Sequence, residues 1–231
     1  MPEIICQQGS PEWKAARAGV VTSSMFSVAQ EKLKRASGSS KAGDPSKAAK
    51  DYAFRLAVER ISGAPLDDDT YDTYAMRRGR EFEPDARFLH EKERDIVVRQ
   101  VGFYKSDDGL YGSSVDGMID EGSADQSRGS AEYKCFISPT SLQPILLNGD
   151  VSDIRDQLQG SMMVTGCDWA ELCLYCPALM PINRHLTIIR EYRNEKYIAE
   201  LKAGLEEFYE LVYLYEYRLK NDKEYLEWRA A

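Results

Sequence analysis

Two carboxylates and a lysine lie close together in the middle of the chain. Asp116 stands in Gly112-Ser-Ser-Val-Asp-Gly117, and Glu132 and Lys134 stand in a Glu-Tyr-Lys tripeptide. Glu132 and Lys134 are two positions apart, so on a β-strand their side chains share one face. The stretch between Asp116 and Glu132 is rich in Gly, Ser and Asp and can form a hairpin, which would bring the three side chains together. Burying such a group on one side of a sheet is costly unless it serves a purpose.

A divalent metal would supply that purpose. Mg²⁺ prefers oxygen ligands and keeps several waters, so two carboxylates and a backbone carbonyl are enough to hold it. Lys134 cannot ligate while protonated, but beside a metal and a water its pKa can fall, so that it orients or deprotonates a nucleophile. The metal would polarise a phosphate, and a second ion could stabilise the leaving oxygen. The spacing alone leaves a cross-strand ion pair as the alternative.

The elements that must position these residues follow from the periodicity of the chain. Helices are predicted over 10–18, 46–62, 73–93, 153–165 and 194–221, with a further helix capped by Thr22-Ser23-Ser24. Strands are predicted over 96–104, 110–113, 115–119, 130–136, 169–176 and 185–192. In the second helix the expected apolar stripe is Tyr52, Leu56, Val58 and Ile61. This order favours a single α/β domain over 1–231, with a mixed central β-sheet flanked by helices.

Composition sets limits on the function. The 231 residues carry a net charge of −8, which argues against a protein that simply coats DNA. It does not exclude an enzyme that gathers Lys and Arg in one channel. The basic stretch 34–47 is either a solvated linker or a loop that contacts DNA. We expect a cytoplasmic protein that does not enter the membrane, because no apolar run approaches ~20 residues and no signal peptide is evident.

The five cysteines form a poor framework for disulfides. Cys173 and Cys176 make a CxxC, but the surrounding residues indicate a strand, where positions three apart point to opposite faces. No second CxxC is present. We therefore expect buried, inert thiols rather than a zinc or redox site.

Five ordered blocks resemble the phage lambda exonuclease family, within the wider PD-(D/E)xK nucleases. They are Trp13-Lys-Ala-Ala-Arg17-Ala-Gly-Val-Val-Thr22-Ser-Ser24, Gly79-Arg-Glu-Phe-Glu83-Pro-Asp-Ala86, Ser114-Val-Asp116-Gly117, Glu132-Tyr-Lys134 and Gln157-Leu-Gln159. Their order and spacing match the family over about residues 10–165, and five blocks are far more specific than one. The resemblance implies a restriction-endonuclease-like core.

The resemblance also implies roles for single residues. Asp116 and Glu132 would ligate Mg²⁺ together with the Tyr133 backbone carbonyl, as part of a two-ion site that Mn²⁺ could also fill. Lys134 would activate the attacking water. Glu83 would hold a metal-bound water or Lys134. The alternative is that Glu83 is a surface carboxylate on a helix with no role in the site.

A second set of residues would form a pocket for a 5′-phosphate: Arg17, Ser24 and Gln157. A guanidinium grips phosphate through two hydrogen bonds, and hydroxyl and amide groups add neutral ones. A surface salt bridge is the alternative for Arg17, and an ordinary helix cap is the alternative for Ser24.

Met76 falls where the family has an apolar wedge that separates the terminal base pairs. Core packing is the alternative for this residue. Arg77 and Arg78 beside it make a basic cluster suited to phosphates, although paired arginines at this point depart from the family pattern. The stretch 34–47 also aligns poorly, so it carries no assigned contact.

The implied activity is that of a processive 5′→3′ exonuclease, which degrades one strand of linear double-stranded DNA and leaves a 3′ overhang for recombination. A toroidal homotrimer and a single-strand annealing protein as partner are implied as well. Two other hypotheses stay open: an endonuclease or RecB-like single-strand nuclease of the same superfamily, and a non-catalytic DNA-binding subunit of a recombination complex.

Overall fold

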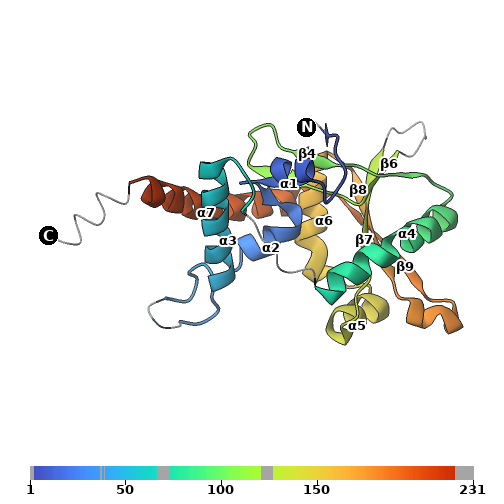
Figure 1. The fold of residues 1–231 in the computed structure, drawn as a ribbon. Coiled ribbons are helices and arrows are strands. Elements are labelled where there is room, and N and C mark those ends of the chain that lie inside the picture. The colour runs from blue at the N-terminus through green and yellow to red at the C-terminus, as the bar shows by residue number, and fades with distance from the viewer. Residues whose placement is uncertain (1–2, 37, 39, 67–72, 121–126, 222–231) are drawn as a thin grey trace.

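A five-stranded mixed sheet forms the centre of the fold (Figure 1). The computed structural model describes residues 3–221 except 37, 39, 67–72 and 121–126. The strand order is β3-β6-β7-β8-β9, and only β7 and β8 run parallel. The bounds are β3 Val98–Arg99, β6 Gly117–Asp120, β7 Arg128–Lys134, β8 Trp169–Tyr175 and β9 Leu186–Tyr192.

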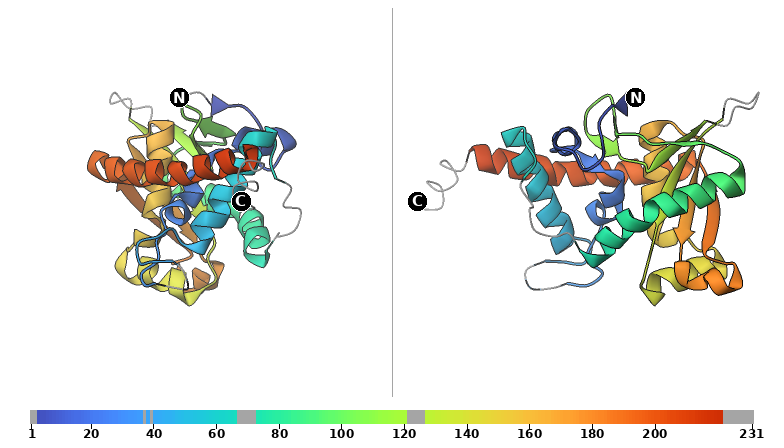
Figure 2. Two further views of the ribbon diagram at one scale, coloured as in Figure 1. Left: turned by 90° about the vertical axis from the view of Figure 1, so that its left-hand side faces the viewer. Right: turned by 45° about the vertical axis from the view of Figure 1, so that its right-hand side comes forward.

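The two faces of this sheet enter two separate apolar cores. On β8, the alternate residues Ala170, Leu172 and Leu174 belong to the larger core, and Trp169, Cys173 and Tyr175 belong to the smaller one. Helix α6 (Ser152–Thr165) covers the first face, and helix α4 (Tyr74–Arg94) covers the second (Figures 1 and 2). Because side chains alternate along a strand, both faces of β8 are buried.

A second, four-stranded sheet lies beside the first, in the order β1-β4-β5-β2. Its strands are β1 Glu3–Ile4, β4 Phe103–Lys105, β5 Tyr111–Ser113 and β2 Val21–Thr22. The strand predicted over 96–104 is therefore wrong as a single element, since β3 and β4 belong to different sheets. Gly102 stands at the crossing, where a Cβ atom would come within 2.3 Å of the Ile4 carbonyl oxygen. Only glycine fits that close approach.

The predicted helices are present, and four of them begin after a side-chain cap; the cap expected at Thr22-Ser23-Ser24 is not formed. Helices α1 (Pro11–Arg17), α3 (Lys47–Ser62), α4 and α7 (Glu195–Lys220) start after side chains that accept a backbone N–H. Those side chains belong to Ser10, Ser46, Thr73 and Asn194. The helix predicted after Thr22 is short, a turn η1 (Ser23–Met25) followed by α2 (Phe26–Ala29).

The apolar stripe predicted for α3 is partly wrong. Ile61 is 44% exposed, and the buried face is made largely of Ala49, Ala53, Leu56 and Ala57. Helix α3 crosses α7 (Figure 1), and small alanine side chains allow two helices to approach closely. Ile61 follows the helical period less well than the alanines do. The alanines were not predicted as the buried face because alanine is only weakly hydrophobic.

Four elements were not predicted: the short strands β1 and β2, helix α5 (Pro139–Asn148) and the 3₁₀ segment η2 (Pro177–Ile182). The fold class is nevertheless confirmed as one mixed α/β domain. Of the cysteines, Cys167, Cys173 and Cys176 are buried and free, as predicted, whereas Cys6 and Cys135 are half-buried. None of the helices in the described ranges is long and apolar enough to cross a bilayer.

Candidate active site

The β6–β7 hairpin brings Asp116 to Glu132 and Lys134. Asp116 directly precedes β6, and its backbone N–H donates to the Ala131 carbonyl at 3.1 Å. Its Oδ2 accepts the Tyr133 backbone N–H at 2.7 Å. The hairpin expected from the sequence is therefore present, and it fixes the Asp116 carboxylate against the last residues of β7.

Glu132 and Lys134 share a face of β7, as their spacing predicts. Lys134 Nζ lies 2.8 Å from Glu132 Oε1. Gln157, on the first turns of α6, donates from Nε2 to the same Glu132 oxygen at 2.6 Å. Glu132 is 6% exposed, so its charge is held almost entirely by these two neighbours. A carboxylate fixed in this way is preorganised to bind a further cation.

The electrostatics of the site are dominated by crowded acids. Burial, then the Glu132 and Glu83 carboxylates, raise the pKa of Asp116 well above its ordinary value. Burial also raises the pKa of Glu83, and its ion pair with Arg87 offsets part of this effect. Burial opposes the charge on Lys134, but Glu132 outweighs it, so the pKa of Lys134 is raised. A positive charge in addition to Lys134 would stabilise all three carboxylates.

This donor set fits a magnesium ion. Within the described ranges, no three His, Cys, Asp or Glu side chains form a cluster able to hold a metal by themselves. The set is therefore two carboxylates, those of Asp116 and Glu132, with the backbone carbonyl of Tyr133 available beside them. Hard oxygen donors with room for waters are what Mg²⁺ prefers. Glu83 influences both acids electrostatically from α4 and is not needed as a ligand.

A buried polar network lies behind Tyr133, on the face of the sheet covered by α4. His90 Nδ1 lies 3.0 Å from the Tyr133 hydroxyl, and its Nε2 lies 2.7 Å from Glu171 Oε2. Glu171 Oε1 accepts from Arg190 Nε at 3.1 Å and lies 3.4 Å from Arg94 Nε. The signal in the sequence was a charged residue inside the apolar run of β8. The network ties α4 to the strand that carries Glu132 and Lys134.

Arg17, Ser24 and Met76 line one pocket of about 490 Å³, with Trp13 and Tyr52 among its other walls. Ser24 is exposed and its hydroxyl contacts Thr22 Oγ1 at 3.3 Å, while η1 has no side-chain cap. The alternative of an ordinary helix cap is therefore wrong. Met76 is 54% exposed, which excludes core packing for this residue. The pocket has polar groups at one end and an exposed methionine among its lining residues.

Arg17 is held in place by Trp13 and Ser114. Its guanidinium stacks 4.1 Å over the Trp13 ring and donates from Nη1 to Ser114 Oγ at 3.3 Å. Trp13 Nε1 donates to the same hydroxyl at 2.8 Å. Among the described residues Arg17 forms no ion pair, and burial lowers the pKa of its guanidinium. The Glu59 carboxylate lines the same pocket and partly offsets the effect of burial on the pKa of Arg17, but it does not pair with the guanidinium. The guanidinium therefore keeps donors that suit a phosphate.

Ser114 lies in one of the five blocks that resemble the exonuclease family, but no role was predicted for it. Gln157 was predicted in the phosphate pocket, yet it does not line that pocket and instead contacts Glu132. Arg78 packs 4.5 Å over the Phe82 ring, and Arg77 is exposed beside it on α4. The predicted site residues thus fall into two groups, named for the roles proposed for them: the cutting centre (Asp116, Glu132, Lys134 and Gln157) and the end pocket (Arg17, Ser24 and Met76). Ser114, which contacts Arg17, precedes Asp116 by two positions.

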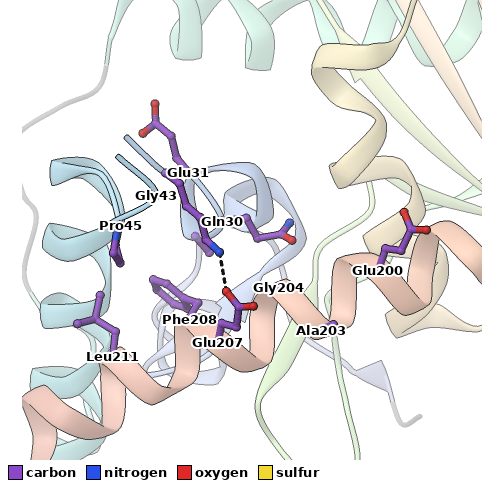
Figure 3. Close-up of a pocket in the computed structure, with 12 residues that line it drawn as sticks. Gln30, Glu31, Gly43, Pro45, Glu200, Ala203, Gly204, Glu207, Phe208 and Leu211 are labelled. Atoms are coloured by element: carbon purple, nitrogen blue, oxygen red, sulfur yellow. Dashed lines mark hydrogen bonds and ion pairs between the residues drawn. The ribbon is translucent and has the colours of Figure 1, made fainter. Parts of the chain in front are cut away.

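Another hollow, of about 560 Å³, lies between α2, residues 31–32 and 43–45, and α7 (Figure 3). Helix α7 contributes Ala203, Gly204, Glu207, Phe208 and Leu211 to its walls. Glu31, Glu200 and Glu207 line it, and Lys32 is paired with Glu207 at 2.6 Å. Its acidic walls would repel a phosphate, so this hollow is less suited to an anion than the pocket that Arg17 lines.

Fold and site together define a nuclease-type α/β domain. Residues 12–168 match the sequence profile of the YqaJ-like viral recombinase domain, which covers more than half of the chain. The protein therefore belongs to the family of YqaJ-like viral recombinase domains, which confirms the resemblance found in the sequence. A comparison with curated protein sequences gave no significant match.

Solved structures with the same fold support this assignment. The alkaline exonuclease LHK-Exo from Laribacter hongkongensis is 26% identical, with a TM-score of 0.75, over 94% of this chain and 100% of that one. The same values hold for its complex with dAMP. A phage-related exonuclease from Haemophilus somnus 129PT shares the fold at 18% identity and a TM-score of 0.59, over 88% of this chain and 96% of that one.

Proposed function

We propose that the protein is a Mg²⁺-dependent 5′→3′ exonuclease. It digests one strand of linear double-stranded DNA from a 5′-phosphorylated end and leaves a 3′ single-stranded overhang for annealing-based recombination. Membership of a viral recombinase family and the fold shared with LHK-Exo support the class of activity. The direction and the end preference rest on the relation between the end pocket and the cutting centre.

One observation carries the proposal: on the chain, a single residue, Val115, separates Ser114 at the end pocket from Asp116 in the cutting centre. Ser114 contacts Arg17, and Asp116 follows it by two positions. Two residues of chain span at most roughly 7 Å, which is similar to the separation of neighbouring phosphates in an extended DNA strand. A strand whose terminal phosphate binds Arg17 would therefore present its next phosphodiester to Asp116. Mononucleotides are the expected product, and the dAMP bound to LHK-Exo agrees with that product.

Each residue of the cutting centre has a stated task. Asp116, Glu132 and the Tyr133 carbonyl would hold Mg²⁺, with two ions per site and Mn²⁺ as a substitute. When bound, the metal neutralises and polarises the phosphate. Lys134 orients the attacking water and withdraws its proton, a task that becomes easier once Glu132 no longer raises the pKa of the lysine. Gln157 holds the Glu132 carboxylate in place, and Glu83 orients Lys134 or a water.

The end pocket selects the strand. Arg17 and Ser24 bind the 5′-phosphate. Gln157 does not line this pocket and acts instead through its hydrogen bond to Glu132.

Met76, exposed at the same pocket, would separate the terminal base pair, while Arg77 and Arg78 would contact phosphates. If Met76→Ala slowed digestion of blunt and frayed ends equally, the wedge role would be wrong. An endonuclease would not need such a pocket, and a non-catalytic subunit would not need Lys134.

Arg17→Ala is expected to remove the preference for a 5′-phosphate. The parent should digest 5′-phosphorylated duplex faster than 5′-hydroxyl duplex, and the variant should lose roughly 10-fold or more of that ratio, because a hydrogen bond to a charged group contributes about 1.5–3 kcal/mol. Timed digestion of both duplexes measures it. Arg99→Ala is the control, since Arg99 pairs with Glu3 on the surface at 3.1 Å. Equal digestion of both ends by the parent would refute the end pocket.

Partners complete the proposal. The resemblance of the sequence to the lambda exonuclease family implies a ring-shaped, processive homotrimer that encircles DNA and acts in the cytoplasm beside a single-strand annealing protein. The net charge of −8 suits a ring that is negative outside and positive within. Light scattering at micromolar concentration should give a trimer mass, and a monomer mass would contradict the ring.

A further inference from the structure

Three buried serines meet at the junction of η1, β5 and α6. Ser23 Oγ lies 2.9 Å from Ser113 Oγ, Ser113 donates to Ser161 Oγ at 3.0 Å, and Ser161 donates to Ser23 Oγ at 3.2 Å. Their exposed fractions are 4%, 0% and 3%. The three hydroxyls, here called the serine cluster, form a closed ring in which each donates once and accepts once.

The cluster is not explained by packing. Three alanines would place an apolar group in the same space, and burying hydroxyls gains stability only where every donor and acceptor is satisfied. The ring satisfies them, but only if the three elements keep one relative position, because hydrogen bonds are directional whereas apolar contacts are not. The cluster therefore fixes geometry more strictly than an apolar contact would.

Each serine of the cluster adjoins a residue of the site. Ser23 precedes Ser24 of the end pocket, and Ser113 precedes Ser114, the partner of Arg17. Ser161 lies four positions after Gln157, so both point from the same side of α6, and Gln157 holds Glu132. Helix α6 stands between α2 and β8 (Figure 1), so the cluster lies where the elements of the pocket meet the helix that reaches the cutting centre.

We propose that the serine cluster sets the distance between the end pocket and the cutting centre, so that Ser23, Ser113 and Ser161 are positioning residues for cleavage one nucleotide from a 5′-phosphate. This rests on the proposed function. The terminal phosphate and the next phosphodiester must be held at the same time, and a strand tolerates little error in their spacing. A shift of about 1 Å can lower a rate by about 10²-fold.

The test is a triple variant, Ser23→Ala/Ser113→Ala/Ser161→Ala. Removing all partners together leaves no unsatisfied hydroxyl, so the variant should fold with a melting temperature near that of the parent. Digestion of 5′-hydroxyl duplex should change little. The preference for 5′-phosphorylated duplex should fall by roughly 10-fold to 100-fold, and the products should include species longer than mononucleotides. If Ser161→Ala alone folds poorly, the triple variant still tests whether the serine cluster sets the end preference and the product size.

Thr165→Val is the matched control. Thr165 lies one turn beyond Ser161 on α6, is equally buried, and donates its hydroxyl to the Ser161 carbonyl at 2.7 Å rather than to the cluster. It should lose stability yet keep the end preference and the product size. A triple variant with the parent's preference and products would overturn the inference. A parent with no end preference would instead refute the proposed function, so the two failures are distinguishable.

Discussion

Lys134→Ala is expected to slow the digestion of linear duplex DNA by about 10²- to 10⁴-fold, the contribution typical of a positioned acid–base group. Lys134 Nζ is the cation that contacts Glu132, at 2.8 Å, and it lies on the face of β7 that Asp116 approaches. Its side chain is 25% exposed at the end of the strand, so truncation removes the charge without opening the core. The melting temperature should therefore stay within a few degrees of the parent's.

Two comparisons separate this loss from a general defect. Lys220→Ala removes another lysine in an ion pair with a glutamate, Glu216 at 2.6 Å on the exposed end of α7, and should digest DNA at the parental rate. Binding of Mn²⁺ measured by calorimetry should persist in Lys134→Ala but weaken strongly in Asp116→Asn, because Asp116 is one of the proposed ligands and Lys134 is not. If Lys134→Ala digested DNA as fast as the parent, or if digestion continued in excess EDTA, the assigned mechanism would fail.

The cutting centre could be predicted from the sequence because it depends on local geometry. Glu132 and Lys134 are two apart on a strand, and the turn-rich stretch before them returns the chain beside Asp116. The end pocket depends on contacts between elements more than a hundred residues apart in the case of Trp13 and Ser114. For that reason Arg17 was indicated by the resemblance to the family and not by residue spacing. The hydrogen bond from Gln157 to Glu132 was not predicted.

The fold shows the same limit. The helix beginning at Ser10-Pro11 was recognised by its cap and its proline, yet α5 begins with the same pair, Ser138-Pro139, and ends at Gly149. Pro144 inside α5 removes a backbone donor and hid the helix. The division of the strands into two sheets could not be predicted, because it depends on the close approach of Gly102 to Ile4 across almost a hundred residues.

Glu171 is the buried charge on which the sheet face under α4 depends. It is fully buried, and its oxygens are held by His90 at 2.7 Å and by Arg190 at 3.1 Å. Burial alone would raise the pKa of Glu171, but His90 and Arg190 outweigh it, so its pKa lies below the ordinary value. The ionised form is therefore the one that stabilises the fold, and it does so through partners from α4 and β9.

Glu171→Ala is expected to lower the free energy of unfolding by about 3–5 kcal/mol, because removing one partner of a buried pair leaves the other without compensation. His90 Nε2 and Arg190 Nε would then lose the carboxylate oxygens that they contact, and the link from α4 to Tyr133 would loosen. Urea denaturation measures the change. Lys47→Ala, which breaks the exposed Lys47–Asp51 pair, is the control and should cost at most ~1 kcal/mol.

The loss should also depend on pH in a defined direction. Since the pKa of Glu171 is depressed in the folded protein, the stability that its charge contributes is present above the unfolded value of about 4.3 and is lost as pH falls through the folded pKa. The difference between parent and Glu171→Ala should therefore be largest near neutral pH and should narrow in acid. A difference that widened on acidification would mean that Glu171 is protonated in the fold, and a loss no larger than that of Lys47→Ala would mean that the network contributes nothing to stability.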